Sequence, residues 1–103
     1  MRFRDRVQKR LEKEGWNVKT IHDRMLDFIC TRRKREMAVK LKAHKHLNFW
    51  ERERLLEHEL KIGVPIFLMS VDRFNELRLI KLSHDMYHHP SHQLGEVREI
   101  RIR

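Results

Sequence analysis

The sequence is poor in the residues that make disulfides, tight turns and membrane spans. Cysteine occurs once, glycine three times and proline twice among 103 residues. The single Cys30 excludes an internal disulfide, is typical of a reducing compartment, and is expected to be a buried apolar side chain. No apolar run approaches the roughly 20 residues that span a bilayer, and the first residues lack a signal-peptide core. We therefore expect a soluble cytoplasmic protein, and its richness in Arg, Lys and Glu is typical of thermophiles.

Basic residues outnumber acidic ones. There are 24 Lys and Arg against 15 Asp and Glu, which gives a formal net charge of +9. Such a field favours a polyanionic partner, with nucleic acid first and an anionic membrane surface second. A basic surface without any partner is the alternative that charge alone leaves open.

The apolar residues come in periodic blocks, which predicts one ordered domain over residues 1–103 with a core in 3–82 and a C-terminal extension in 83–103. The four-residue recurrence of Phe3, Val7 and Leu11 predicts a helix that ends before Gly15. A second helix is expected to start at Asn48, with a capping box to Glu51 and an apolar side formed by Phe49, Leu56 and Leu60. Strands are predicted over 16–22, 24–31, 36–44, 64–71, 76–82 and 98–103, the last as an edge strand or dimer contact. This order predicts an α/β fold in which helices pack on the faces of a mixed sheet.

Segments 24–31 and 36–44 are expected to form a hairpin. Because residues 32–35 contain no Gly or Asn, a loop of about four residues is favoured over a two-residue turn. A hairpin centred between Arg33 and Lys34 pairs residues whose numbers sum to 67, which sets Asp27 opposite Lys40. Directly opposed Cβ atoms lie about 4.5–5.5 Å apart, so the Lys40 ammonium is expected to neutralise Asp27.

Several of these features resemble the PD-(D/E)XK nuclease superfamily, and most closely the archaeal Holliday junction resolvases. The resemblance covers about residues 3–82. Its carriers are the leading charged helix that ends in Gly15-Trp16, Asp27 within "LDFI", the strand "MAVKLK", and the helix followed by "GVPIFLMSV". It implies a restriction-endonuclease-like mixed central sheet flanked by helices, and a Mg²⁺-dependent DNA endonuclease.

The resemblance also implies roles for individual residues. Asp27 corresponds to the metal-binding Asp and Lys42 to the catalytic Lys, while Asp5, or alternatively Glu12, corresponds to an acid on the first helix. Lys40 stands where the family has a metal-binding Glu, so the metal site is expected to be degenerate. Glu36 shares the strand face of Lys40 but lies about 13 Å away along the strand at roughly 3.3 Å per residue, too far to replace the lost ligand without a bulge.

Clustered cations indicate where DNA would be bound. Phosphate contacts need Lys and Arg donors but no base-specific pattern. The candidate DNA-binding residues are Arg4, Arg32, Arg33, Lys34, Arg35, Lys40, Lys42 and Lys45. The group His84, Asp85, His88, His89 and His92 is read either as a zinc site or, in preference, as a polar segment without metal.

The sequence thus predicts a homodimeric, non-membrane protein that binds duplex or branched DNA through a nuclease-like fold with a degenerate metal site. The alternatives are an active Mg²⁺-dependent endonuclease or Holliday junction resolvase and a non-enzymatic assembly subunit.

Overall fold

The described part of the chain folds into one six-stranded sheet with two helices. A computed structural model describes residues 1–43, 47–83 and 99–101, the last three by their backbone alone. The elements in chain order are α1 (Phe3–Lys13), β1 (Asn17–Thr20), β2 (Phe28–Arg32), β3 (Arg35–Leu41), α2 (Phe49–Ile62), β4 (Ile66–Val71), β5 (Leu77–Lys81) and β6 (Glu99–Arg101). No helix among the described residues is long and apolar enough to cross a membrane.

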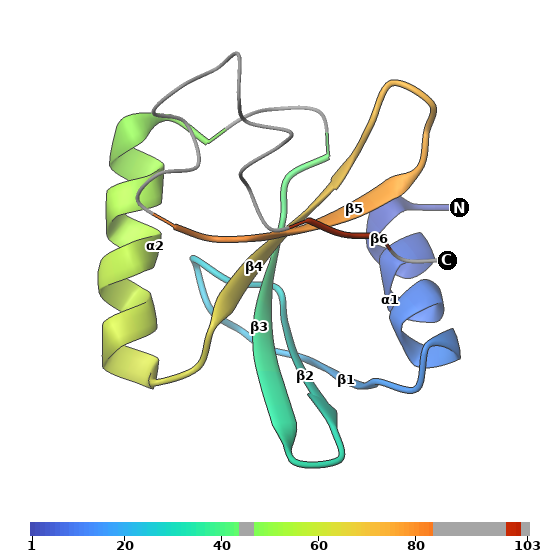
Figure 1. The fold of residues 1–103 in the computed structure, drawn as a ribbon, viewed down its shortest axis with the longest axis horizontal. Coiled ribbons are helices and arrows are strands. Elements are labelled where there is room, and N and C mark those ends of the chain that lie inside the picture. The colour runs from blue at the N-terminus through green and yellow to red at the C-terminus, as the bar shows by residue number, and fades with distance from the viewer. Residues whose placement is uncertain (44–46, 84–98, 102–103) are drawn as a thin grey trace.

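The strands lie in the sheet in the order in which they occur in the chain. All neighbouring strands are antiparallel except β3 and β4, which are parallel. A parallel pair needs a long crossover, and α2 provides it. As a result β3 and β4 both finish at the same end of the sheet, where the N–H of Val71 donates to the carbonyl of Ala43 at 3.0 Å. We call this end the upper end, as it appears in Figure 1.

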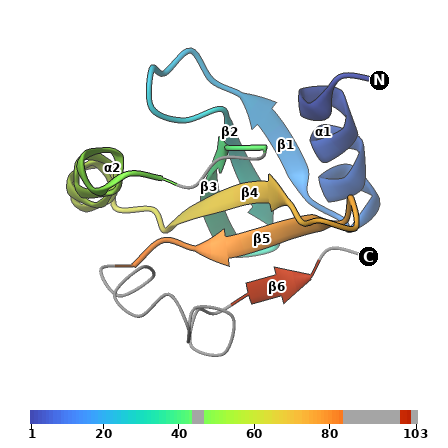
Figure 2. The same cartoon turned by 90° about the horizontal axis from the view of Figure 1, so that it is seen from above.

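The two helices cover opposite faces of the sheet, as Figure 2 shows from above. On one face Val7 and Leu11 of α1 pack against Phe28 and Val39. On the other face Leu55 and Leu56 of α2 pack against Ala38 and other residues of the sheet. Because side chains alternate along a strand, the apolar residues of β3 and β4 supply both clusters. The predicted α/β architecture is confirmed.

Cys30 lies at the centre of β2 and is fully buried under α1. Burial raises the pKa of its thiol to about 12, because the interior disfavours the charged thiolate. The expectation of a buried apolar side chain is confirmed.

The predicted boundaries of α2 are confirmed, but its predicted apolar side is right at Leu56 and wrong at Phe49 and Leu60. Asn48 and Glu51 form the expected capping box, and Gly63 ends the helix in the left-handed region at φ 69°. The buried face is centred on Arg52, Leu55 and Leu56. Phe49 and Leu60 lie beyond the margin of that face and are 56% and 85% exposed. Their spacing fits one side of a helix, but the sheet contacts the side next to it.

The β2–β3 hairpin has the predicted register. Its pairs run from Phe28 with Val39 to Arg32 with Arg35, so that each pair of numbers sums to 67. The predicted loop of about four residues is wrong, because Arg32 and Arg35 are themselves paired and only two residues form the turn. Arg33 allows this by adopting a positive φ of 57°, a conformation that is uncommon for an arginine and that its residue type does not predict.

Strands β4 and β5 follow the prediction closely. Pro65 precedes β4 and leaves its carbonyl to accept from the N–H of Ala38 at 2.9 Å. Strand β6 pairs with β5 at the edge of the sheet, which confirms the edge-strand alternative for the C-terminus. The His84–His92 group lies outside the described residues.

Candidate nucleic-acid interface and the Asp27 site

Asp27 lies at the upper end of the sheet, immediately before β2. Its N–H donates to the carbonyl of Val39 at 2.9 Å, one residue out of the register that β2 and β3 otherwise keep. Its carboxylate Oδ2 accepts from the N–H of Leu41 at 2.8 Å. The side chain therefore does what a backbone carbonyl does in a regular ladder, and it fastens the last residue of β3 to the start of β2.

Arg4 of α1 supplies the positive charge beside Asp27. One guanidinium nitrogen of Arg4 donates to Oδ1 of Asp27 at 3.0 Å and the other to the Asp27 carbonyl at 3.3 Å. The same guanidinium lies over the ring of the fully buried Phe28, 4.9 Å from its centroid. The expected ion pair between Lys40 and Asp27 is therefore wrong, since Asp27 is slipped by one residue and turns toward α1.

Lys40 and Lys42 belong to the opposite face of the sheet, the face that α2 covers. The ammonium of Lys42 lies 2.8 Å from Oε2 of Glu51 in the first turn of α2. The hydrogen bond from Lys42 lowers the pKa of Glu51, and the cap hydrogen bond and the charges of Lys42 and Lys40 act in the same direction. Lys40 also lines a hollow of about 120 Å³ with Glu51 and Arg54.

Glu51 is a site residue that sequence reasoning assigned only to a cap. Its two oxygens have different partners, the N–H of Asn48 at 3.4 Å and Lys42 at 2.8 Å. The start of α2 places Glu51 beside the end of β3. Glu51 and Lys42 are nine positions apart in the sequence, and this separation does not predict their contact.

The remaining predicted acids do not join Asp27. Glu36 pairs with Thr31 near the far end of the hairpin, and Asp5 lies exposed on α1. In residues 1–43 and 47–83 no three His, Cys, Asp or Glu side chains gather in a way that could hold a metal ion. A hard cation such as Mg²⁺ requires several oxygen ligands, whereas Asp27 is bound by a guanidinium. The described side chains therefore do not fit a Mg²⁺ site.

A second group of cations occupies the lower end of the sheet, at the turn between β2 and β3. Arg33, Lys34 and Arg35 are exposed there. With Glu14, Gly15 and Arg32 they line an open hollow of about 890 Å³. Arg32 is fixed, because its guanidinium stacks 4.3 Å from the centroid of Trp16 and donates to the Glu14 carbonyl at 2.9 Å.

The predicted DNA-binding residues therefore fall into two separate groups. Arg4, Lys40 and Lys42 lie at the upper end, and residues 32–35 lie at the lower end. Six residue-to-residue steps along β3, from Arg35 to Leu41, separate them by about 20 Å at roughly 3.3 Å per step. Lys45 lies outside the described residues.

One of three comparisons with known proteins bears on the fold. No family model and no curated protein matches this chain. Among solved structures it is similar to Hjc of Archaeoglobus fulgidus, described as a Holliday junction resolvase from an archaeal hyperthermophile. The TM-score is 0.63 at 16% sequence identity, over 78% of this chain and 70% of the other. The chain thus has the restriction-endonuclease-like α/β fold of that resolvase, as the sequence predicted.

Proposed function

We propose that this chain is a DNA-binding protein of nuclease-like fold in which ion pairs occupy the region where nucleases of this fold bind metal. The observation that carries the proposal is the contact between Arg4 and the Asp27 carboxylate. A guanidinium at 3.0 Å from a carboxylate oxygen neutralises the charge that would attract a divalent cation, and it repels that cation.

Binding to DNA is supported by charge and its distribution. The chain carries a net charge of +9, and exposed cations lie at both ends of the sheet. Arg33, Lys34 and Arg35 have no acidic partner among the described residues, so their charges are free to meet phosphates. Contacts of this kind depend on the backbone of DNA rather than on its sequence.

A titration of a labelled duplex by fluorescence anisotropy at several salt concentrations tests the binding. Affinity should fall steeply as salt rises, because each neutralised phosphate releases counterions. Absence of DNA binding even at low salt would favour the alternative of a non-enzymatic assembly subunit, whose basic surface contacts a protein.

The second candidate function is a Mg²⁺-dependent endonuclease or junction resolvase. The observation that favours it is Glu51, a carboxylate brought to within 2.8 Å of the Lys42 ammonium from a neighbouring helix. A plasmid nicking assay with magnesium or manganese separates the two candidates. No nicking is expected. Nicking that is abolished by Glu51→Gln, while duplex binding persists, would replace the first proposal by the second.

The expected homodimer stays a prediction. Sedimentation equilibrium of the protein alone and with duplex tests it. The masses of a single chain alone and of a single chain bound to the duplex would contradict it.

A further inference from the structure

The turn between β4 and β5 presents an aromatic ring to solvent. Phe74 is 69% exposed, and the guanidinium of Arg73 lies 4.9 Å from its ring centroid. Single exposed apolar side chains are common and need no explanation by themselves. The turn that carries this one, however, is held in place by a dense set of polar contacts.

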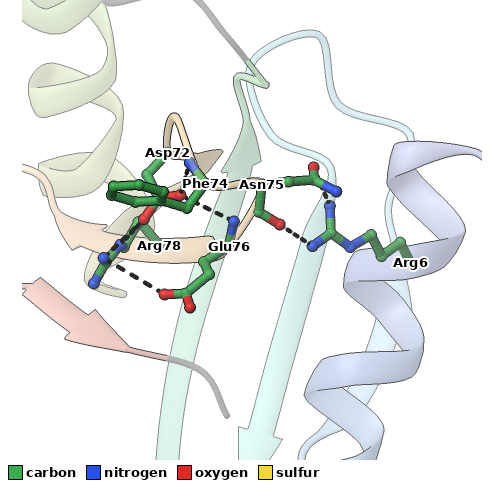
Figure 3. A network of polar contacts seen from close by, with 6 residues as sticks. All are labelled: Arg6, Asp72, Phe74, Asn75, Glu76 and Arg78. Carbon is green, nitrogen blue, oxygen red and sulfur yellow. Dashed lines mark hydrogen bonds and ion pairs between the residues drawn. The ribbon is translucent and has the colours of Figure 1, made fainter.

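Asp72 organises the turn, as Figure 3 shows. Its Oδ1 accepts from the N–H groups of Phe74 at 2.8 Å and Glu76 at 3.0 Å. Its Oδ2 accepts from the guanidinium of Arg78 at 2.9 Å and 2.7 Å. Asn75, at φ 62°, completes a three-residue hairpin loop by donating its N–H to the Asp72 carbonyl. The backbone on both sides of Phe74 is therefore fixed, so the ring is presented from a rigid support.

The loop is also fastened to α1. Arg6 donates from one guanidinium nitrogen to the side-chain oxygen of Asn75 at 3.0 Å and from the other to the Asn75 carbonyl. Figure 3 shows this pair bridging the helix and the turn. The contact joins residues 69 positions apart, which sets the position of Phe74 relative to the first turns of α1.

The surroundings of Phe74 suit a nucleic acid. The turn follows β4 at the upper end of the sheet, the end that carries Arg4 and Lys42. Arg73 is exposed and its guanidinium lies over one face of the ring, which leaves the other face for a base, and Arg2 is exposed at the start of α1. Cations flanking an exposed ring are the elements from which single-strand binding surfaces are made, since phosphates meet the cations and a base stacks on the ring.

We infer that Phe74 is a stacking platform for an unpaired nucleobase, and that the substrate class of this surface is DNA with exposed bases, such as a gap, fork or single strand. The inference rests on the proposed DNA-binding function and goes beyond it, because phosphate contacts alone do not distinguish paired from unpaired DNA. Stacking requires a base face that a closed duplex does not offer.

The test compares a labelled duplex with the same duplex carrying a short single-stranded gap, by anisotropy over a salt series. The parent should prefer the gapped DNA. Phe74→Ala should weaken binding to the gapped DNA about 5- to 100-fold and change duplex binding less than about twofold. The salt dependence should not change, because no charge is removed. Phe74→Trp should restore the preference.

The matched control is Leu60→Ala, which removes an apolar side chain that is 85% exposed near the C-terminal end of α2. It should leave both affinities unchanged. If the parent binds duplex and gapped DNA equally, or if Phe74→Ala leaves the preference intact, the inference fails while the proposed function stands. If the parent binds no DNA at low salt, the proposed function itself fails. If Phe74→Ala leaves DNA binding intact but lowers the sedimenting mass, the ring belongs to a protein contact and the inference is overturned.

Discussion

Replacement of Asp27 by alanine should destabilise the protein, because the carboxylate is a structural acceptor. Asp27→Ala removes the acceptor for the N–H of Leu41 and the charged partner of Arg4. Replacing a carboxylate that serves to bind a metal ion has a different effect on stability. Such a carboxylate is often strained or repelled by its neighbours in the metal-free protein, so its removal is neutral or stabilising.

The expected magnitude follows from the two contacts. A partly buried backbone donor left without its acceptor costs about 1–3 kcal/mol. The ion pair contributes at most about 1 kcal/mol, because the side chains of Arg4 and Asp27 are 40% and 22% exposed. Together the loss is about 1–4 kcal/mol, which for a chain of this length lowers Tm by roughly 5–30 °C.

Thermal melting followed by circular dichroism measures this loss, with Asp27→Asn as the matched control. The amide oxygen of asparagine still accepts from Leu41, so the control should lose no more than about 1 kcal/mol. An alanine variant that melts at or above the parent temperature would refute the structural role of Asp27 and restore the case for a metal ligand.

Three further predictions concern charge. Replacing residues 33–35 by alanine should leave Tm unchanged and weaken duplex binding, with the slope of log affinity against log salt reduced by up to about 2.7; an unchanged slope would mean that this turn faces away from DNA. Hydrogen bonds from Glu76, Arg78 and Phe74 lower the pKa of Asp72 in the folded state, so its contribution to stability is present above the ordinary carboxyl pKa and is lost as pH falls through the lowered one. The variant Asp72→Asn should therefore melt lower than the parent at about pH 7, and the difference should shrink by about pH 3. Neither Lys40→Glu alone nor Arg4→Gln combined with Lys40→Glu should give a Tm that rises on adding magnesium or manganese, because residue 40 faces α2 whereas Asp27 turns toward α1, so the two carboxylates cannot share an ion; a metal-dependent rise would show that the two side chains lie on the same face.

The parts of the fold that depend on local chemistry could be predicted from the sequence. Asn48 and Glu51 define the start of α2 because the capping box involves only four consecutive residues. The register of β2 and β3 follows from the position of the turn, because one turn fixes every pair.

The parts that depend on side chains meeting across elements could not be predicted. Nothing near Arg4 indicates that it reaches Asp27, which lies 23 positions away and is slipped out of register. The register pairs position 27 with position 40 and therefore favoured Lys40 as the partner of Asp27. The Lys40 side chain instead faces α2. The apolar residues of α2 were misplaced for a related reason, since spacing gives a helix an apolar side but the sheet decides how that side is turned.

The burial of Cys30 has a practical consequence for the study of this molecule. The thiol lies in the middle of β2, with β1 and β3 on either side and α1 above it. A reagent that attacks thiolates can reach it only after the helix lifts or the strands part, and the raised pKa suppresses attack in the closed state further. Because this is the one thiol in the chain, the rate at which a thiol reagent labels the protein measures how often the structure around Cys30 opens. Labelling with and without DNA would therefore report whether a bound nucleic acid holds the two layers together, with no introduced probe.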